Sequence, residues 1–248
     1  MPLTFAHPAA VLPFSRKSKY IHFPALVLGS MAPDFEYFLR GQPIGDIGHT
    51  FSGFLTYNLP LVAFFYLIFH FFIYQTLFNQ MPAFLQDSTK SRLHANYAMR
   101  VIIFVYSALL GMLTHITWDS FTHQNGYMVQ KFPTTLAHTF TIFHFDIPLY
   151  KFLQHGSTLV GLMLIIGYMY FRTYAQKQKK TDIQMKQKLI FWFSLILLTL
   201  AIVVSWYIID YISILSYGIV VVRIIDSFFI SLFITSLFYQ FVLKSNEY

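Results

Sequence analysis

A stretch near the middle of the chain, residues 115–123, combines imidazole and carboxylate side chains at helical spacing. Its sequence is HITWDSFTH, so that four residues separate His115 from Asp119 and Asp119 from His123. On an α-helix, which turns about 100° per residue, this spacing brings the three side chains to one face, drifting by roughly 40° per step. Two imidazoles and a carboxylate in this arrangement can hold a divalent metal ion. The stretch therefore predicts a metal-binding face at the end of a helix.

The residue composition indicates an integral membrane protein. Of the 248 residues, 56% are hydrophobic and 11% are charged, whereas a soluble domain carries about 25% charged residues. The chain has no cysteine, which excludes thiolate ligands, disulfides and cysteine nucleophiles. A divalent metal would therefore be held by nitrogen and oxygen ligands, a set that suits zinc, manganese, iron or magnesium.

The formal net charge of +7 does not by itself indicate nucleic-acid binding. Five lysines gather between two apolar runs, at Lys177, Lys179, Lys180, Lys186 and Lys188. Lysine and arginine accumulate in the cytoplasmic loops of membrane proteins, so this cluster is typical of such a loop. We expect the lipid bilayer, and no nucleic acid, as the partner of this chain, with the C-terminus in the cytoplasm and the N-terminus outside.

The apolar runs predict an all-α, polytopic membrane helix bundle. A helix needs roughly 20 apolar residues to cross about 30 Å of hydrocarbon. Five segments qualify, near residues 53–78, 99–118, 157–174, 189–210 and 217–243. A sixth apolar piece, residues 21–32, is short and ends before Pro33, which predicts a re-entrant or interfacial helix. We expect one membrane domain over residues 1–248, with the polar motifs in 1–156 and membrane helices alone in 157–248.

The order of the spans gathers polar residues on one side of the membrane. The first span begins just after His49, and the second ends near Asp119. Consecutive spans are antiparallel, so these two span ends lie on the same side, together with the segment before His49 and the loop after the second span. The residues expected there include His7, Asp34, His49, His115, Asp119, His123, His138, His144 and Asp146.

Each of these residues also has an ordinary structural interpretation. Asp34 follows Pro33 in a turn pattern whose carboxylate often caps a backbone amide. His115 and Asp119 can form a hydrogen-bonded pair without a metal, although ionisable groups within a membrane are functional candidates by default. His123 lies where the helix is expected to end, which suits a substrate-facing group as well as a ligand. Farther along the chain, the i, i+3 spacing of Arg223 and Asp226 predicts a buried ion pair.

Four motifs in the first 150 residues resemble a known family. They are TFAHPAA at 4–10, GSMAPDFEYF at 29–38, GHTF at 48–51 and THITWDSFTH at 114–123. In this combination they resemble the bacterial membrane proteins of domain-of-unknown-function family 4184. More distantly, the order His, Pro-Asp, His-Thr and HXXXDXXT is similar to the inner-membrane metal-dependent hydrolase family. The present chain departs from that pattern by having Phe35-Glu36 after Asp34, and Asp46-Ile47-Gly48 before His49.

The resemblance implies a metal-dependent hydrolase in a bacterial inner (cell) membrane. Its presumed ligands correspond here to His7, Asp34, His49, His115 and Asp119, which would hold one divalent metal or two, such as Zn, Mn or Mg. Glu36, His123 and Asp146 are the residues that we expect to act as general acid or base. A site at the membrane edge favours an amphipathic ester or phosphoester, such as a lipid-linked phosphate. The alternative is a non-enzymatic structural or transport protein in which the same residues form a structural polar network.

Overall fold

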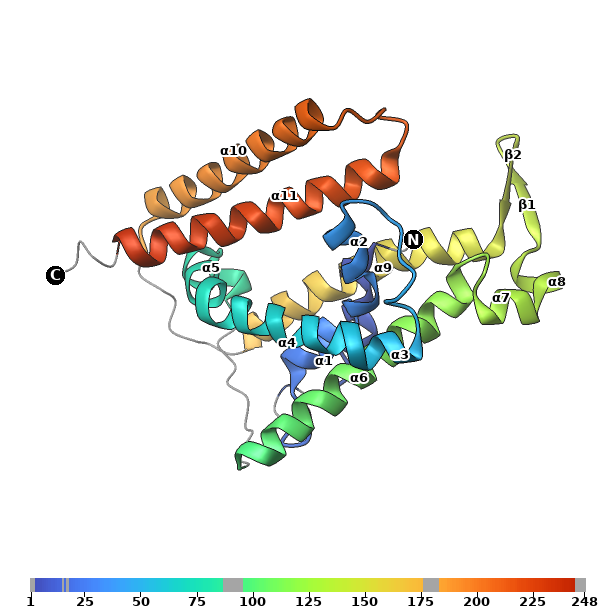
Figure 1. Cartoon of the computed structure of the whole chain (residues 1–248), viewed down its shortest axis with the longest axis horizontal. Helices are drawn as coiled ribbons and strands as arrows, with labels where there is room; N and C mark the ends of the chain where they lie inside the picture. Colours follow the sequence, from blue (N-terminus) through green and yellow to red (C-terminus); the bar gives the residue numbers. More distant parts are fainter. Residues whose placement is uncertain (1–2, 15, 17, 87–95, 176–182, 244–248) are drawn as a thin grey trace. The chain divides into compact units, whose positions relative to one another are not determined.

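A computed structural model describes residues 3–14, 16, 18–86, 96–175 and 183–243, and this part of the chain is almost entirely helical (Figure 1). Its elements are the 3-10 helix η1 (Thr4–Val11), α1 (Phe23–Gly29), the 3-10 helix η2 (Ala32–Asp34), α2 (Phe35–Arg40), α3 (Phe51–Gly53), the π-helix η3 (Phe54–Asn58), α4 (Leu59–Ile68), the π-helix η4 (Phe69–Ile73), α5 (Tyr74–Gln80), the 3-10 helix η5 (Ala83–Leu85), α6 (Tyr97–Thr122), α7 (Tyr127–Lys131), α8 (Pro133–Leu136), strands β1 (Thr139–Ile142) and β2 (Phe145–Pro148), α9 (Leu149–Ala175), α10 (Met185–Ile209), α11 (Tyr217–Phe238) and the π-helix η6 (Tyr239–Leu243). The predicted all-α fold is confirmed.

Five helical segments have the length and the apolar composition needed to span a membrane. They are Phe51–Gln80, Tyr97–Thr122, Leu149–Tyr174, Met185–Ile209 and Tyr217–Phe241. Each coincides with one of the five spans predicted from hydropathy, so the chain is an integral membrane protein. The sixth apolar piece forms α1, whose seven residues rise only about 10 Å and cannot cross the bilayer.

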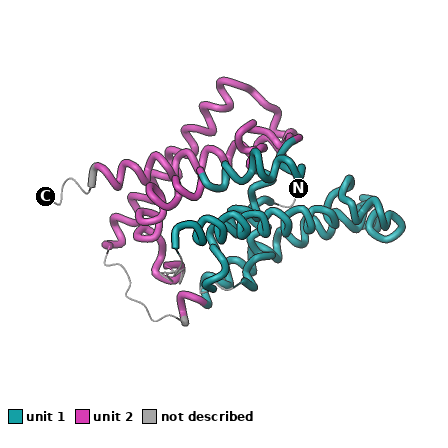
Figure 2. Tube along the Cα trace, turned by 60° about the horizontal axis from the view of Figure 1, so that its bottom comes forward, with its two compact units in different colours: residues 1–34, 47–63, 89–171 teal, residues 35–46, 64–88, 172–248 magenta. Residues whose placement is uncertain are grey.

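The described residues divide into two compact units whose segments alternate along the chain (Figure 2). The first unit comprises residues 1–34, 47–63 and 89–171, and the second comprises 35–46, 64–88 and 172–248. Every predicted metal ligand belongs to the first unit. The two units are described separately below.

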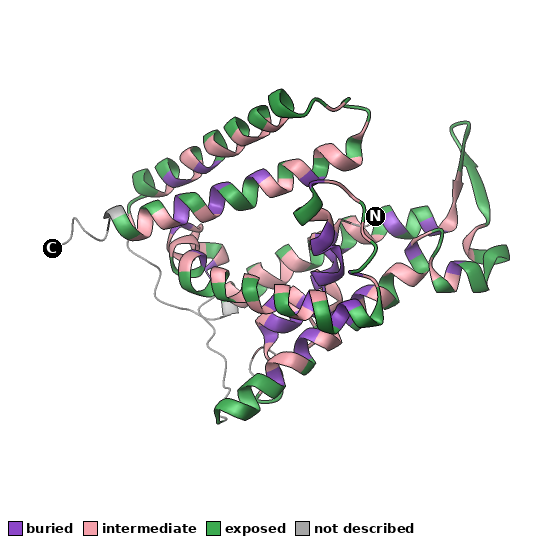
Figure 3. Ribbon diagram, viewed as in Figure 1, coloured by how far each residue is buried: buried purple, intermediate pink, exposed green. Residues whose placement is uncertain are grey.

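In the first unit, α6 is the element against which the N-terminal segment packs. Helix α1 lies along α6, and their backbones approach closely at glycines: a Cβ atom on Gly111 would lie 2.3 Å from the Leu26 carbonyl oxygen. Small residues at a helix crossing permit this kind of approach between membrane helices. Buried residues gather along this contact (Figure 3), where Val11, Phe23 and Leu26 form an apolar cluster. This packing holds η1, α1 and η2 against the second predicted span.

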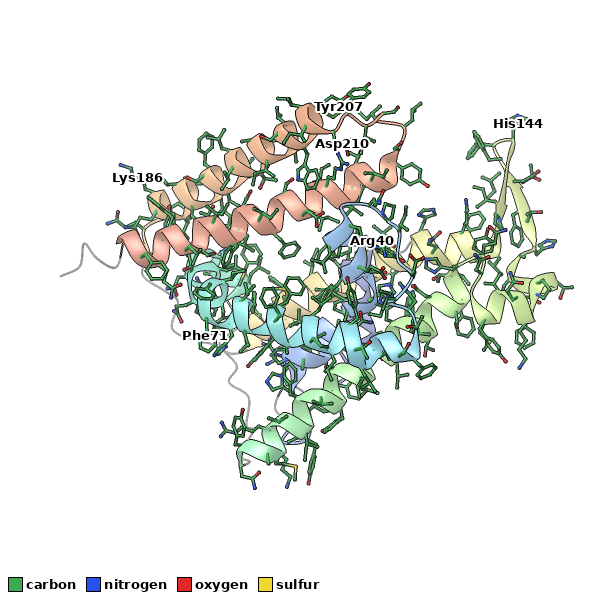
Figure 4. The ribbon with its side chains drawn as sticks, viewed as in Figure 1. Arg40, Phe71, His144, Lys186, Tyr207 and Asp210 are labelled. Carbon is green, nitrogen blue, oxygen red and sulfur yellow. The ribbon has the colours of Figure 1, made fainter. Side chains whose placement is uncertain are left out.

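Helix α9 covers another side of the N-terminal segment. The Leu3 amide donates to Thr158 Oγ1 over 3.1 Å, and the Trp118 indole N–H of α6 donates to Ser157 Oγ over 3.2 Å. Between α8 and α9, strands β1 and β2 form an antiparallel hairpin that extends away from the helices of this unit (Figure 1). His144 lies at its turn (Figure 4), with a positive φ of 68°.

The second unit is organised around α10 and α11. Phe191 and Leu195 of α10 pack with Ile73 of η4 and Leu232 of α11 in a buried apolar cluster. Of the predicted lysine cluster, Lys177, Lys179 and Lys180 lie outside the described residues.

The predicted pair between Arg223 and Asp226 is wrong. The Arg223 guanidinium instead donates to the carboxylate and to the carbonyl oxygen of Asp210, a residue labelled in Figure 4. The bond to Asp210 joins α11 to the end of α10. Spacing along one helix did not reveal it, because the two residues come from different elements.

Candidate metal centre

The last turns of α6 carry His115 and Asp119 on one face, as the i, i+4 spacing predicts. His115 is fully buried, and its Nδ1 lies 2.8 Å from the Ser30 carbonyl oxygen. A carbonyl oxygen can only accept, so the Nδ1 atom carries the proton and donates it. In the neutral ring, Nε2 then presents a lone pair, which is the state that a metal ligand requires. The backbone of the GSMAPD motif thus selects the ligand tautomer of His115.

Asp34 reaches the same place from η2, directly after Pro33. Its side chain is buried, and the Thr4 hydroxyl donates to Asp34 Oδ2 over 2.6 Å. The other oxygen, Oδ1, lies 3.6 Å from His115 Nε2 and 3.6 Å from His49 Nε2. The hydroxyl therefore occupies one carboxylate oxygen and leaves the second one facing two imidazoles.

His49 enters from the loop that precedes α3. Its neighbour Gly48 touches the Pro33 backbone, since a Cβ atom on Gly48 would lie 2.2 Å from the Pro33 carbonyl oxygen. The Asn58 amide donates to the Gly48 carbonyl oxygen over 2.6 Å. The Thr50 hydroxyl accepts from the Gly53 amide and caps the N-terminus of the helix that follows. These contacts place His49 beside Asp34.

The four side chains form a compact group of potential ligands, Asp34, His49, His115 and Asp119, with one ligand atom from each within 4.8 Å of all the others. The distances from His115 Nε2 to Asp119 Oδ2 and from His49 Nε2 to the same oxygen are 3.2 and 3.7 Å. Four ligands at about 2.1 Å from a tetrahedral zinc ion lie about 3.4 Å from one another. With the two 3.6 Å contacts of Asp34 Oδ1, the spacing suits one metal ion.

The electrostatics of the group also favour a cation. Asp34 Oδ1 and His115 Nε2 are both buried without a hydrogen-bond partner. Burial opposes the ionisation of Asp34, but attraction to His115 outweighs it, so that the pKa of Asp34 lies below its ordinary value. That attraction requires a protonated His115, because two carboxylates are costly to bury without a compensating positive charge. A divalent cation supplies that compensation.

His7 and His123 lie beside the other oxygen of Asp119. His7 Nε2 lies 3.6 Å and His123 Nδ1 lies 3.4 Å from Asp119 Oδ1. The His7 ring stacks on His115 with centroids 3.8 Å apart. Burial, together with the neighbouring His115, lowers the pKa of His7 to about 4, so His7 is neutral at pH 7. The predicted ligand His7 therefore adjoins the four-residue group through Asp119.

The other predicted residues make different contacts. Glu36 belongs to the second unit, where its carboxylate pairs with Arg40 at 2.7 Å. Asp146 is exposed in the hairpin and accepts a hydrogen bond of 2.6 Å from the Thr141 hydroxyl. His138 packs edge-on against Phe140 at the base of the same hairpin. His123, which is also among the three residues predicted to act as general acid or base, contacts the cluster through Asp119.

The cluster is reachable from one side. His7, Asp34 and His115 are buried, but the side chains of His49 and His123 are 29% and 28% exposed, and that of Asp119 is 14% exposed. Water and part of a substrate can therefore approach Asp119. Asp119 lies one turn before α6 ends at Thr122, which places the group at the edge of the predicted membrane span.

Two residues that orient the ligands were not predicted from sequence. Thr4 holds Asp34, and the Ser30 carbonyl oxygen holds His115 Nδ1. The available signal was their position: Thr4 lies three residues before His7 in the first motif, and Ser30 lies four before Asp34 in the second. The hydroxyl of Thr4 is a natural hydrogen-bond partner for a nearby metal ligand. Ser30 contacts His115 through its backbone carbonyl oxygen, which any residue type would supply.

The fold and this site together define an integral membrane protein with a carboxylate–imidazole group that can bind a metal ion. The family described as a domain of unknown function (DUF4184) matches residues 1–245. The chain therefore belongs to that family, and the match includes the last two spans as well as the four motifs. No curated protein and no solved structure was matched. The distant resemblance to the inner-membrane metal-dependent hydrolases stays a prediction.

Proposed function

We propose that this protein is a membrane-embedded, metal-dependent hydrolase. The observation that supports the proposal is the set of four ligand atoms on Asp34, His49, His115 and Asp119, at mutual distances that suit one divalent ion. Two imidazoles and two carboxylates favour zinc or manganese, with magnesium as a third choice because it prefers an all-oxygen shell. The fixed tautomer of His115 and the partial exposure of Asp119 are the features that a working centre requires.

The proposed reaction is the hydrolysis of an ester or a phosphoester. A bound divalent ion lowers the pKa of a coordinated water to about 7 and polarises the substrate oxygen. The water oxygen forms the new bond to carbon or phosphorus, the bond to the alcohol oxygen breaks, and one proton of the water passes to the released alcohol. His123, which is neutral because burial lowers its pKa, is suitably placed beside Asp119 to accept and return that proton.

The location of the cluster supports an amphipathic substrate. The ligands lie where a membrane span ends, and His49 and His123 offer the exposed approach. A lipid-linked phosphate or a phospholipid can present its headgroup there while its chains stay in the bilayer. In line with the family resemblance, we place the protein in a bacterial inner (cell) membrane.

The direct test is the metal content of the full-length protein purified in detergent without chelator. We expect a divalent metal in the wild type, detected by elemental analysis, and its loss in His115→Ala and Asp119→Ala. His155→Ala is the matched control, because His155 is an exposed histidine of α9 in the same unit. Hydrolysis of p-nitrophenyl phosphate and p-nitrophenyl acetate should follow metal content. Full metal retention in both cluster variants would contradict the proposal.

The alternative is a structural polar network. It is favoured by the contacts that join the N-terminal segment to α6, namely the bond from Thr4 to Asp34 and the bond from His115 to Ser30. In that case a protonated His115 would pair with the carboxylates, and thermal stability in detergent would be indifferent to added Zn²⁺ or Mn²⁺. A metal-binding protein is instead stabilised by those ions, because they bind the folded state.

A further inference from the structure

Asp119 faces two separate groups of imidazoles, one with each carboxylate oxygen. Oδ2 faces His115 at 3.2 Å and His49 at 3.7 Å. Oδ1 faces His7 at 3.6 Å and His123 at 3.4 Å. The four-residue group uses Oδ2 and does not explain why His7 and His123 face Oδ1.

His7 is the buried polar side chain that points to an additional ligand. It is 4% exposed, and neither Nδ1 nor Nε2 has a hydrogen-bond partner. Asp119 Oδ1, which its Nε2 faces, is also buried without a partner. Burying unpaired nitrogen and oxygen atoms next to each other costs free energy unless a third species joins them. A neutral imidazole cannot donate from both nitrogens, so at least one lone pair of His7 is available.

The stacking of His7 on His115 brings two imidazoles to the same carboxylate. The ring centroids are 3.8 Å apart and the planes differ by 18°. Both rings direct Nε2 toward the same carboxylate, His115 toward Oδ2 and His7 toward Oδ1. Two ions, one at each oxygen of Asp119, would share that carboxylate as a bridging ligand. Metal ions in two-metal hydrolytic sites lie about 3.5–4 Å apart.

We propose that the protein binds a second divalent cation at His7 Nε2, Asp119 Oδ1 and His123 Nδ1, with the Asp119 carboxylate bridging the two ions. The inference rests on the proposed function, because it takes the four-ligand group as the first site. With ligand bonds of about 2.1 Å, the two contacts of Asp119 Oδ1 correspond to ligand–metal–ligand angles of about 110–120°, which a tetrahedral or five-coordinate ion accepts.

As a ligand of the second ion, His123 would no longer accept the proton of the attacking water, and the second site must also accommodate its other contacts. Its Nδ1 lies 3.2 Å from Thr122 Oγ1 and 3.3 Å from the Asp119 carbonyl oxygen, an acceptor, so an ion binds there only in the tautomer that carries its proton on Nε2. The Thr122 hydroxyl also donates to the Trp118 carbonyl oxygen over 3.3 Å, so it keeps a partner when Nδ1 binds an ion. His123 is 28% exposed, so water can reach this side of the second site.

Two ions on a bridging carboxylate narrow the substrate class. Such a pair stabilises both the attacking and the leaving oxygen of an in-line displacement, the arrangement that phosphatases and nucleases use. The second site therefore favours the phosphoester over the carboxylic ester among the proposed substrates.

The test is the metal stoichiometry of the full-length protein in detergent, loaded with excess MnCl₂ and freed of unbound ion by gel filtration. We expect two Mn²⁺ per chain in the wild type, one in His7→Ala and in His123→Ala, and two in the His155→Ala control. Electron paramagnetic resonance should show two exchange-coupled ions in the wild type and an isolated ion in the variants. Because His7 is buried, the partly exposed His123→Ala decides the result if His7→Ala fails to fold.

The possible outcomes separate this inference from the proposed function. One Mn²⁺ per chain in the wild type, unchanged in His123→Ala, would overturn the second site and leave the hydrolase proposal standing. Two ions in the wild type and in both variants would also overturn it, since the second ion would then be bound elsewhere. No bound ion in the wild type would contradict both proposals.

Discussion

The hydroxyl of Thr4 offers a sharp test of how the metal centre is built. Thr4 donates to Asp34 Oδ2 over 2.6 Å at a buried position, while Asp34 Oδ1 faces His49 and His115. Thr4→Val removes the donor and nearly preserves the shape of the side chain. The carboxylate of Asp34 would then be free to rotate and turn Oδ1 away from the ligand position. We expect the variant to fold and to bind a divalent ion more weakly.

The size of the effect follows from the strength of the lost contact. A hydrogen bond to a charged group contributes about 1.5–3 kcal/mol. Loss of a residue that orients a metal ligand costs about 10–100-fold in metal affinity, which corresponds to about 1.4–2.8 kcal/mol. The two ranges agree, so we expect the dissociation constant for Zn²⁺ to rise by about 10–100-fold.

The assay is competition for Zn²⁺ against a chromophoric chelator, with the full-length protein in detergent. Thr117→Val is the matched control. Thr117 lies on α6 between His115 and Asp119, but it is exposed and its hydroxyl donates to the Leu113 carbonyl oxygen within the helix. The control should bind Zn²⁺ as the wild type does. An affinity of Thr4→Val within twofold of the wild type would refute the view that this hydroxyl positions Asp34.

Two further predictions concern the loop that carries His49 and the effect of pH. Gly48→Ala places a methyl group 2.2 Å from the Pro33 carbonyl oxygen, so the loop must shift and divalent-metal affinity should fall by at least about tenfold. The control is Gly156→Ala, whose methyl group meets nothing within 4 Å and should leave the metal affinity unchanged. Equal losses of affinity in both variants would contradict this reasoning. Apparent Mn²⁺ affinity should fall between about pH 7 and pH 5, because protonation removes the lone pair of a ligand imidazole. The pKa of Asp34 lies below its ordinary value, so the carboxylate stays ionised over this range and the loss reflects protonation of imidazole ligands. Calorimetric titration with Mn²⁺ at several pH values tests this pH dependence. An affinity that stays constant or rises toward pH 5 would contradict the prediction.

Much of the fold could be predicted from hydropathy, because lipid imposes a uniform condition on every span. About 20 apolar residues must be consecutive to cross the bilayer, and this condition is local in sequence. For the same reason the five spans found in the structure coincide with the predicted ones. The pair of Arg223 with Asp210 was not predictable in this way, because it depends on how α10 and α11 meet.

The candidate site was predictable in part. The i, i+4 spacing of His115 and Asp119 predicts a shared helix face, and antiparallel spans predict that His49 lies on the same side of the membrane. Neither argument gives distances. The 3.6 Å contacts of Asp34 with His49 and His115 join segments that are 15 or more residues apart in sequence. Helical periodicity does not predict how such distant segments meet. Glu36 was predicted from its neighbourhood in a motif, yet its contact with Arg40 is set by the helix it belongs to.

By itself, the sequence determined that this is a membrane protein without thiolate chemistry and with five apolar spans, and it predicted that His49, His115 and Asp119 lie on one side of the membrane. Composition and helical periodicity are local properties, so these conclusions needed no coordinates. The tertiary structure alone decided which atoms meet: the Ser30 carbonyl oxygen that accepts a hydrogen bond from Nδ1 of His115, the hydroxyl that donates to Asp34, and the contacts of Asp119 with two pairs of imidazoles. These contacts depend on the close packing of α1 and the N-terminal segment against α6, because a shift of less than an ångström decides whether a side-chain atom can bind the metal.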